Sequence, residues 1–248
     1  MKRDEVFQDA SFGAGGFNFG RQVADVFDDM VARSVPFYHE QQAMITGIGK
    51  RFHVSGTDVY DLGCSTGATL MNLCRAVDAP AKFIGYDNSA PMLQQAALNI
   101  AERGMNDRIE LRLADFDDDP PTLRIENASV VTMGWTLQFV RPMRRDSLVA
   151  SVYDGLRDGG AFVVTEKVLT NDAEMDGFFI DSYHDLKRRN GYSDAEITNK
   201  REALENVLIP YSVDENHDLF RRNGFQVVET FFQWFNFAGF LCLKRPAL

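Results

Sequence analysis

Cysteine is scarce in this chain of 248 residues, where only Cys64, Cys74 and Cys242 occur. An odd and scattered set predicts no disulfide framework, and the absence of a Cys-x-x-Cys pair argues against a zinc site. Thiols used this sparingly are typical of a reducing compartment. We therefore expect a cytoplasmic protein with free thiols and no bound metal.

Basic residues are fewer than acidic residues in this chain. The chain has 26 Lys and Arg residues against 36 Asp and Glu residues, which gives a formal net charge of −10 at pH 7. A broad phosphate-binding face needs an excess of basic residues, so direct nucleic-acid binding is not expected. A local basic pocket can still hold an anionic ligand.

Long apolar runs are missing as well. No apolar stretch approaches the roughly 18 residues of a membrane-spanning helix, and the first residues lack the apolar segment of a secretory signal, so we expect no membrane association. The composition, with 45% hydrophobic and 25% charged residues, is typical of a globular protein. We expect a single domain over residues 1–248.

Short apolar runs alternate with helical patterns along the middle of the chain. Strands are predicted at 57–62, 83–86, 109–114, 128–133 and 160–165, with helices between them such as 90–103 and 144–156. This alternation predicts an α/β, doubly wound, Rossmann-like fold with a mostly parallel sheet. Two further strands, 226–231 and 235–244, are joined too closely for a crossover helix, so they should form an antiparallel hairpin at the sheet edge.

Three segments fall outside this alternation. Residues 1–22, rich in Phe and Gly, are expected to form an irregular arm or lid, and 23–52 should form two helices that Ser34-Val35-Pro36 interrupts. Residues 170–212 are expected to be a polar helical insertion that covers the open edge of the sheet. The expected divisions of the domain are 1–52, 53–169, 170–212 and 213–248.

The segment Asp61-Leu62-Gly63-Cys64-Ser65-Thr66-Gly67 follows the first strand and opens a helix. Its glycines permit a tight turn and a close approach of backbone to ligand, at the edge where doubly wound sheets bind their ligands. Asp87 ends the second strand about 20 residues later, where a carboxylate can accept hydrogen bonds from both ribose hydroxyls. The loop therefore predicts a nucleoside site.

The same loop argues against other nucleotides. It lacks the Gly-x-Gly-x-x-Gly of NAD sites and the Gly-Lys-Ser/Thr of phosphate-binding loops. The Asp61 carboxylate would repel a pyrophosphate, but it can accept from the ammonium of an amino acid. At the end of the third strand, Asp115 can accept from an adenine amine and Phe116 can stack on the ring. A nucleoside joined to an amino acid is S-adenosylmethionine (SAM), and the pattern resembles the class I SAM-dependent methyltransferase fold, with seven strands.

A closer resemblance runs from about Phe7 to Lys244. The segments that carry it include Arg33-Ser34-Val35-Pro36-Phe37-Tyr38, Val59-Tyr60-Asp61-Leu62-Gly63-Cys64-Ser65, Tyr86-Asp87-Asn88-Ser89, Thr136-Leu137-Gln138-Phe139, Arg189-Asn190-Gly191-Tyr192-Ser193, Lys200-Arg201 and Phe232-Gln233-Trp234-Phe235-Asn236-Phe237. Their order and spacing are similar to those of the carboxy-S-adenosylmethionine synthase family.

The resemblance implies an activity that the fold does not. Members of that family convert SAM and prephenate to carboxy-SAM and phenylpyruvate and transfer no methyl group. A separate enzyme then uses carboxy-SAM to modify the wobble uridine of certain tRNAs. The family is homodimeric, so the resemblance implies a homodimer here.

The resemblance also implies roles for individual residues. The residues implied to contact SAM or carboxy-SAM are Tyr38, Gly63, Cys64, Ser65, Asp87, Asn88, Asp115 and Phe116. Arg201 is implied to hold the carboxylate that is added to the sulfonium methyl, because a guanidinium makes two parallel hydrogen bonds to a carboxylate. The co-substrate can supply both the base and the carbon dioxide, so we expect no protein nucleophile.

Other charged residues are assigned from the pattern of charges. Arg33 and Lys200 are further candidates for cations in the pocket, whereas Lys187-Arg188-Arg189 is expected to be a solvated face or a dimer contact. Glu166, at the end of the fifth strand, is either a base or a carboxylate paired with Lys167 or with a helix end.

The chain departs from the family pattern on the reaction side of the pocket. Gly134 stands where the family has an Asn that contacts the ligand, and Trp135 replaces a Phe. The departure removes a side-chain hydrogen bond and leaves a small gap beside the ligand. It keeps open two alternatives: a SAM-dependent methyltransferase acting on a small-molecule acceptor, and a catalytically idle SAM-binding subunit.

Overall fold

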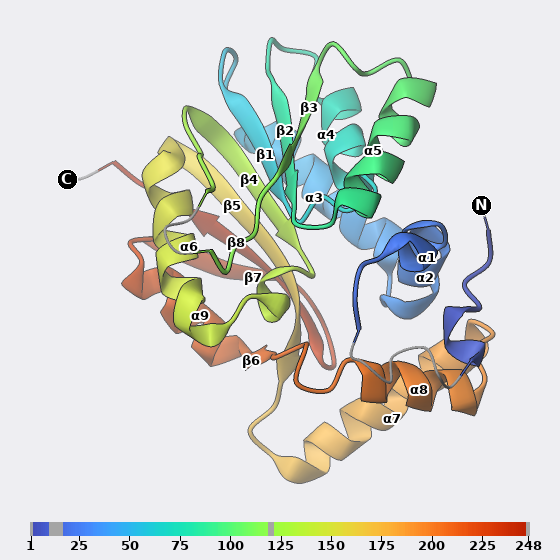
Figure 1. The fold of residues 1–248 in the computed structure, drawn as a ribbon. Helices are drawn as coiled ribbons and strands as arrows, with labels where there is room; N and C mark the ends of the chain where they lie inside the picture. The colour runs from blue at the N-terminus through green and yellow to red at the C-terminus, as the bar shows by residue number, and fades with distance from the viewer. Residues whose placement is uncertain (1, 10–16, 119–121, 247–248) are drawn as a thin grey trace.

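The computed structural model describes residues 2–9, 17–118 and 122–246 and is built on one twisted sheet with helices on both faces (Figure 1). The strand order is β3-β2-β1-β4-β5-β8-β7. The strands are β1 Asp58–Leu62, β2 Phe83–Asp87, β3 Ile109–Leu113, β4 Ala128–Gly134, β5 Leu156–Leu169, β7 Val227–Trp234 and β8 Phe237–Leu243. A short strand, β6 Tyr211–Ser212, pairs with β5.

The strand directions confirm the predicted fold class. The strands β1 to β5 are parallel, whereas β8 is antiparallel to both β5 and β7. The predicted C-terminal hairpin is therefore present, with β7 as the edge strand. β5 is much longer than the predicted run 160–165 and extends beyond its neighbours toward the helical insertion (Figure 1).

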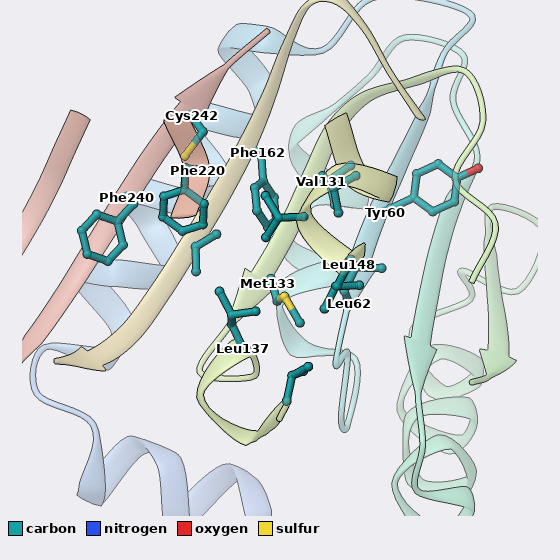
Figure 2. Close-up of a cluster of buried hydrophobic side chains, with 14 of the residues drawn as sticks. Tyr60, Leu62, Val131, Met133, Leu137, Leu148, Phe162, Phe220, Phe240 and Cys242 are labelled. Atoms are coloured by element: carbon teal, nitrogen blue, oxygen red, sulfur yellow. The ribbon is translucent and has the colours of Figure 1, made fainter. Parts of the chain in front are cut away.

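Two layers of apolar side chains fix the helices to the sheet. On one face, α6 Pro142–Gly155 and α9 Val213–Arg222 pack against the sheet in a cluster that includes Leu62, Phe162 and Phe240 (Figure 2). On the other face, α4 Ala68–Ala76 and α5 Ala90–Glu102 pack on the first four strands. All five residues of β2 are buried, and burial on both faces explains why the strand is a continuous apolar run from Phe83 to Tyr86, before Asp87.

The N-terminal helices are α1 Arg21–Ala24, α2 Phe27–Ser34 and α3 Tyr38–Phe52. The predicted interruption near Pro36 is confirmed, and Phe37 takes a left-handed conformation with φ of 52° immediately before α3. A second break at Asp25 and Val26 was not predicted. The predicted arm partly lies outside the described residues, which omit 10–16.

The helical insertion lies in a different place from the one expected. Its helices, α7 Ala173–Arg189 and α8 Asp194–Ala203, lie beyond the carboxyl ends of the strands, beside α1 and α2 (Figure 1). There α8 contacts the short 3-10 helix η1 Val6–Gln8, and α7 contacts α2. The expectation that the insertion covers the sheet edge is wrong, because its apolar side chains pack on the N-terminal segment, on Phe235 in the turn after β7 and on Phe237 at the start of β8.

Capping fixes where the two inserted helices begin. The Asp172 carboxylate accepts from the backbone N–H groups of Glu174 and Met175, and Ser193 forms a reciprocal capping box with Glu196. Among the described residues, no helix combines the length and the apolar character that a membrane crossing requires.

Candidate active site

A cavity of about 1110 Å³ opens at the carboxyl ends of the strands. The loops after β1, β2 and β4 line one side of it, and α2, α7, α8 and residues 17–20 line the other. This is where doubly wound folds bind their ligands, and the volume is slightly above that of most small-molecule sites, which leaves room for two ligands.

The structure brings ten of the eleven predicted site residues to this cavity. They are Tyr38, Gly63, Cys64, Ser65, Asp87, Asn88, Asp115, Phe116, Gly134 and Arg201. Asp61 is not among the lining residues. It is 2% exposed and accepts a hydrogen bond of 2.7 Å from the Thr132 hydroxyl. Burial, opposed by this bond and reinforced by the nearby Asp87, raises the pKa of Asp61 to about 7.

The loop after β1 depends on glycine at one position. Gly63 has φ of 77°, and a Cβ placed there would lie 2.1 Å from the Thr136 hydroxyl oxygen. Cys64 turns inward, where its sulfur lies 2.7 Å from the position of a Cβ on Gly85. Burial raises the pKa of the Cys64 thiol well above its ordinary value, which keeps the thiol neutral and unreactive.

Asp87 ties the ends of β1 and β2 together. Its carboxylate accepts hydrogen bonds from the backbone N–H of Ser65 at 2.8 Å and from that of Ser89 at 2.9 Å. Burial raises its pKa, and these hydrogen bonds oppose the rise. The carboxylate therefore orders both loops while it faces the cavity.

The neighbouring end of β3 adds a second acceptor. Asp115 is exposed and accepts from the backbone N–H of Asp117 at 3.0 Å, and Phe116 is 9% exposed in the cavity wall. Asn88 is exposed beside Asp87. This end of the cavity offers carboxylate oxygens and an aromatic face, which suit hydroxyl and amine donors on an aromatic ligand.

The end of β4 forms a strained part of the wall. Trp135 has φ of 52°, and its ring lies 5.5 Å from that of Tyr38. Among the described residues, the buried Trp135 Nε1 and Thr165 Oγ1 atoms have no hydrogen-bond partner. A Cβ on Gly134 would meet only Thr165 Oγ1, at 3.4 Å. Strain and unpartnered polar atoms are concentrated at functional sites, which supports a ligand here.

Glu166 faces away from the cavity. Its two oxygens accept from the backbone N–H groups of Leu137 and Gln138, at 3.0 and 2.8 Å, at the start of the 3-10 helix η2 Leu137–Phe139. Burial raises its pKa to about 8, although Arg145 and the hydrogen bonds oppose the rise. Of the alternatives open for Glu166, the structure supports the carboxylate at a helix end.

Cations gather at the other end of the cavity. Lys167, Lys187, Lys200 and Arg201 all line it, and Lys187 and Lys200 are only 5% and 7% exposed. The expectation that Lys187 lies on a solvated face is wrong, because the α7 face that carries it turns inward. Arg33 is not a lining residue and instead donates to the backbone oxygens of Asn190 and Asp4.

The sequence carried an unused signal for Lys187. Ile180, Tyr183 and Lys187 are spaced by three and four residues, so they share one face of α7, and all three line the cavity. An apolar stripe that ends in a lysine is typical of a helix face directed at an interior site. Lys167 carried no comparable signal, because one lysine at a strand end is common.

The N-terminal segment closes part of the cavity. Residues 17–20 line it, and the backbone N–H of Phe17 donates to Ala203 of α8 at 2.9 Å. The Ser89 hydroxyl donates to the backbone oxygen of Phe19 at 2.5 Å, and the Phe19 ring packs 5.2 Å from Phe139. The described part of the arm therefore joins the insertion to the nucleoside end of the cavity.

Comparison with known proteins agrees with this geometry. A family described as a methyltransferase domain matches residues 59–160. A carboxy-S-adenosyl-L-methionine synthase from Methylococcus capsulatus is 44% identical over 98% of this chain and 100% of its own length. The protein of the same name from Nitratiruptor is 42% identical over 99% of each chain. The chain belongs to the carboxy-S-adenosyl-L-methionine synthase family.

A solved structure supports the fold alone. An O-methyltransferase family protein from Burkholderia thailandensis has a TM-score of 0.68 at 14% identity, covering 98% of this chain and 67% of that protein. Membership of the synthase family confirms the predicted family and the predicted SAM-dependent transferase, and the fold agrees with that of SAM-dependent methyltransferases.

Proposed function

We propose that this protein is a carboxy-SAM synthase that uses SAM and prephenate. The observation that carries the proposal is one cavity with two chemically different ends. Carboxylates and Phe116 lie at the strand ends, and a group of cations that includes Arg201 lies opposite. The first end suits an adenosine, and the second suits anionic groups on the co-substrate and product.

The residues at the first end fit SAM. Asp87 presents carboxylate oxygens for the ribose hydroxyls, and Asp115 and Phe116 present an acceptor and a ring for the adenine. Gly63 and Ser65 leave backbone exposed where the methionine part would lie. Asp61, close behind this wall, has a pKa of about 7, and a ligand ammonium nearby would favour its charged form.

Arg201 is the residue to which we assign the new carboxylate. It lies on α8 and is exposed on the cavity side. Burial lowers the pKa of the nearby His184, and the charges of Lys187, Arg188, Arg201 and Lys167 lower it further. A guanidinium can hold a carboxylate through two parallel hydrogen bonds. This contact would form with the product and with the developing charge that precedes it.

The overall reaction transfers a carboxyl group and balances without a protein nucleophile. Prephenate loses carbon dioxide and hydroxide as its ring becomes aromatic. The sulfonium methyl of SAM loses one proton and gains the carbon dioxide, and the proton and the hydroxide leave as water. The Cys64 thiol is held neutral by burial, which also raises the pKa of Tyr38. The chain's own contribution is to position both substrates and to exclude water.

The experiment is a direct assay of both products. Purified protein is incubated with SAM and prephenate, the nucleoside is identified by mass spectrometry, and phenylpyruvate is followed by its absorbance. We expect a nucleoside with the mass of SAM plus one carboxyl group, formed in step with phenylpyruvate. Absence of both products from folded, SAM-binding protein would refute the synthase.

A methyltransferase that acts on a small molecule is the second candidate. It is favoured by the space beside Gly134 and by the unpartnered Trp135 Nε1, which together could receive an acceptor. In the same assay this function would leave prephenate unchanged. S-adenosylhomocysteine would accumulate only when an acceptor is supplied.

The proposal also covers the later use of carboxy-SAM and the oligomeric state of the protein. A separate enzyme would use carboxy-SAM to modify a tRNA wobble uridine, because this acidic chain offers no excess of basic residues for binding RNA itself. We propose a cytoplasmic homodimer. Light scattering coupled to size-exclusion chromatography would measure the mass, and a value near 28.0 kDa would indicate a monomer.

A further inference from the structure

We propose that Lys167, Lys187 and Lys200 form a site for the carboxylates of the co-substrate, at the opposite end of the cavity from Asp87. This inference rests on the proposed function for the identity of the co-substrate. The three ammonium groups come from three separate elements, β5, α7 and α8, and all three side chains line the same cavity. Lysines that reach one cavity from three different elements indicate a binding site rather than a charged surface.

The Tyr183 ring organises two of these lysines. The Lys187 Nζ atom lies 4.5 Å and the Lys167 Nζ atom 5.3 Å from the centre of the ring. Both distances fall within the range of a cation–π interaction. The Tyr183 ring in turn packs 5.0 Å from Phe237 of β8. The Tyr183 ring therefore stabilises both ammonium groups without accepting a conventional hydrogen bond from them, so their N–H groups remain able to donate to a ligand.

The lysines lack carboxylate partners within the part of the chain that the structure describes. Lys200 donates to the Ser34 hydroxyl at 3.0 Å, whereas no hydrogen bond or ion pair of the Lys167 or Lys187 side chain occurs there. The charge of Asp4 opposes the lowering of the pKa of Lys187 and Lys200, and the charge of Asp176 does so for Lys167. Asp4 itself accepts from the Tyr192 hydroxyl at 2.5 Å.

Grouping these lysines is unfavourable without a ligand. Burial lowers the pKa of all three, that of Lys200 to about 8, and the charges of Lys200 and Lys167 lower the pKa of Lys187 further. A buried ammonium with no anion costs stability. An anionic ligand would remove this cost, and its charge would favour the protonated lysines.

The number of cations points to a dicarboxylate. Together with Arg201, four cationic side chains face the cavity at this end, whereas SAM carries one carboxylate. A co-substrate with two carboxylates would offset more of this positive charge than a co-substrate with one. With a single carboxylate, two of the three lysines would have no carboxylate from the co-substrate.

The test is calorimetric titration of prephenate into protein saturated with S-adenosylhomocysteine, which lacks the sulfonium methyl and cannot react. The variants are Lys187→Met and, as a matched control, Arg189→Met, which removes the same charge from an exposed position on the same helix. We expect the prephenate Kd to rise about thirtyfold in Lys187→Met and to stay unchanged in Arg189→Met. The S-adenosylhomocysteine Kd should be the same in all three proteins.

A second readout separates binding from loss of structure. Without ligand, Lys187→Met should melt about 2–4 °C higher than the unmodified protein, because an uncompensated buried charge is gone. If Lys187→Met fails to fold, Lys167→Met serves in the same titration. An unchanged prephenate Kd in a folded lysine variant would overturn the site, as would an equal loss of S-adenosylhomocysteine binding, which would assign the lysines to SAM.

Failure of this site and failure of the proposed function give different results. If the unmodified protein forms carboxy-SAM and the lysine variants bind prephenate normally, the synthase stands and the lysine site is refuted. If prephenate binds in a lysine-dependent manner but neither product forms, the site stands and the synthase is refuted.

Discussion

The Asp87 carboxylate accepts a hydrogen bond of 2.8 Å from the backbone N–H of Ser65, and so joins the end of β2 to the loop after β1. Its second oxygen accepts from the backbone N–H of Ser89. A residue assigned to the ribose is thus also a structural link between two loops. Binding and loop order should change together when this carboxylate is altered.

Asp87→Asn should weaken S-adenosylhomocysteine binding by about tenfold to a hundredfold. The backbone N–H groups of Ser65 and Ser89 donate to the two carboxylate oxygens of Asp87, whereas an amide offers only one acceptor oxygen. Calorimetric titration measures the change. Asp78→Asn, which changes an exposed aspartate two residues after α4, is the control and should bind normally. Equal affinity in Asp87→Asn would remove Asp87 from the proposed nucleoside site.

Two glycine substitutions in the cavity wall should have opposite outcomes. Gly63→Ala should lose about 2 kcal/mol or more of unfolding free energy, because φ is positive and the new Cβ would overlap Thr136. Gly134→Asn should remain within about 1 kcal/mol of the unmodified protein, since a Cβ there meets only Thr165 Oγ1 at 3.4 Å. Urea unfolding measures both.

Gly134→Asn also tests the reaction side of the pocket. It restores the residue that the family pattern carries, so carboxy-SAM formation should persist or rise. A collapse of activity in the folded variant would indicate that this wall has been rebuilt for another acceptor.

Glu166 should make stability depend on pH. Its pKa is raised from 4.5 to about 8, so the carboxyl stabilises the fold when protonated, and this contribution is lost as the pH rises through about 8. Glu166→Gln has no such titration but leaves one backbone N–H without its acceptor. The melting temperature of Glu166→Gln should therefore lie furthest below that of the unmodified protein near pH 5 and approach it near pH 8. Scanning fluorimetry across this range measures the gap, and a constant gap would contradict the assignment.

Arg201→Ala should abolish carboxy-SAM formation and leave the SAM Kd within about twofold, because the guanidinium is assigned to the added carboxylate alone. Arg201→Lys should recover only part of the activity, since an ammonium cannot make the two parallel bonds of a guanidinium. Product formation is followed by mass spectrometry. Turnover equal to that of the unmodified protein in Arg201→Ala would refute the role.

Much of the fold could be predicted because local signals agreed with the global arrangement. β2 is apolar from Phe83 to Tyr86 and buried on both faces, and Gly63 has the positive φ that the loop after β1 requires. The short connection between β7 and β8 left no room for a crossover helix. These features depend on neighbouring residues, which a sequence shows directly.

The rest depended on contacts between distant segments. The place of the insertion follows from packing of α8 on the distant η1, where the Asn199 side chain donates to the backbone oxygen of Phe7, 192 residues earlier in the chain. Lys187 of α7 is buried, although its charge alone predicted exposure. Asp61 was expected in the site by spacing, but the direction of its side chain was decided by Thr132 on the adjacent strand.

Glu166 and Lys167 are consecutive residues of β5 whose side chains leave opposite faces of the strand, one to hold η2 and the other to line the cavity. Slippage of β5 by a single position against β4 or β8 would exchange them. The carboxylate would then face the site that we assign to the anionic co-substrate, and the ammonium would face two backbone N–H groups. Electrostatic repulsion in both places would penalise the slipped pairing, so these two adjacent charges help to lock the alignment of the central strands.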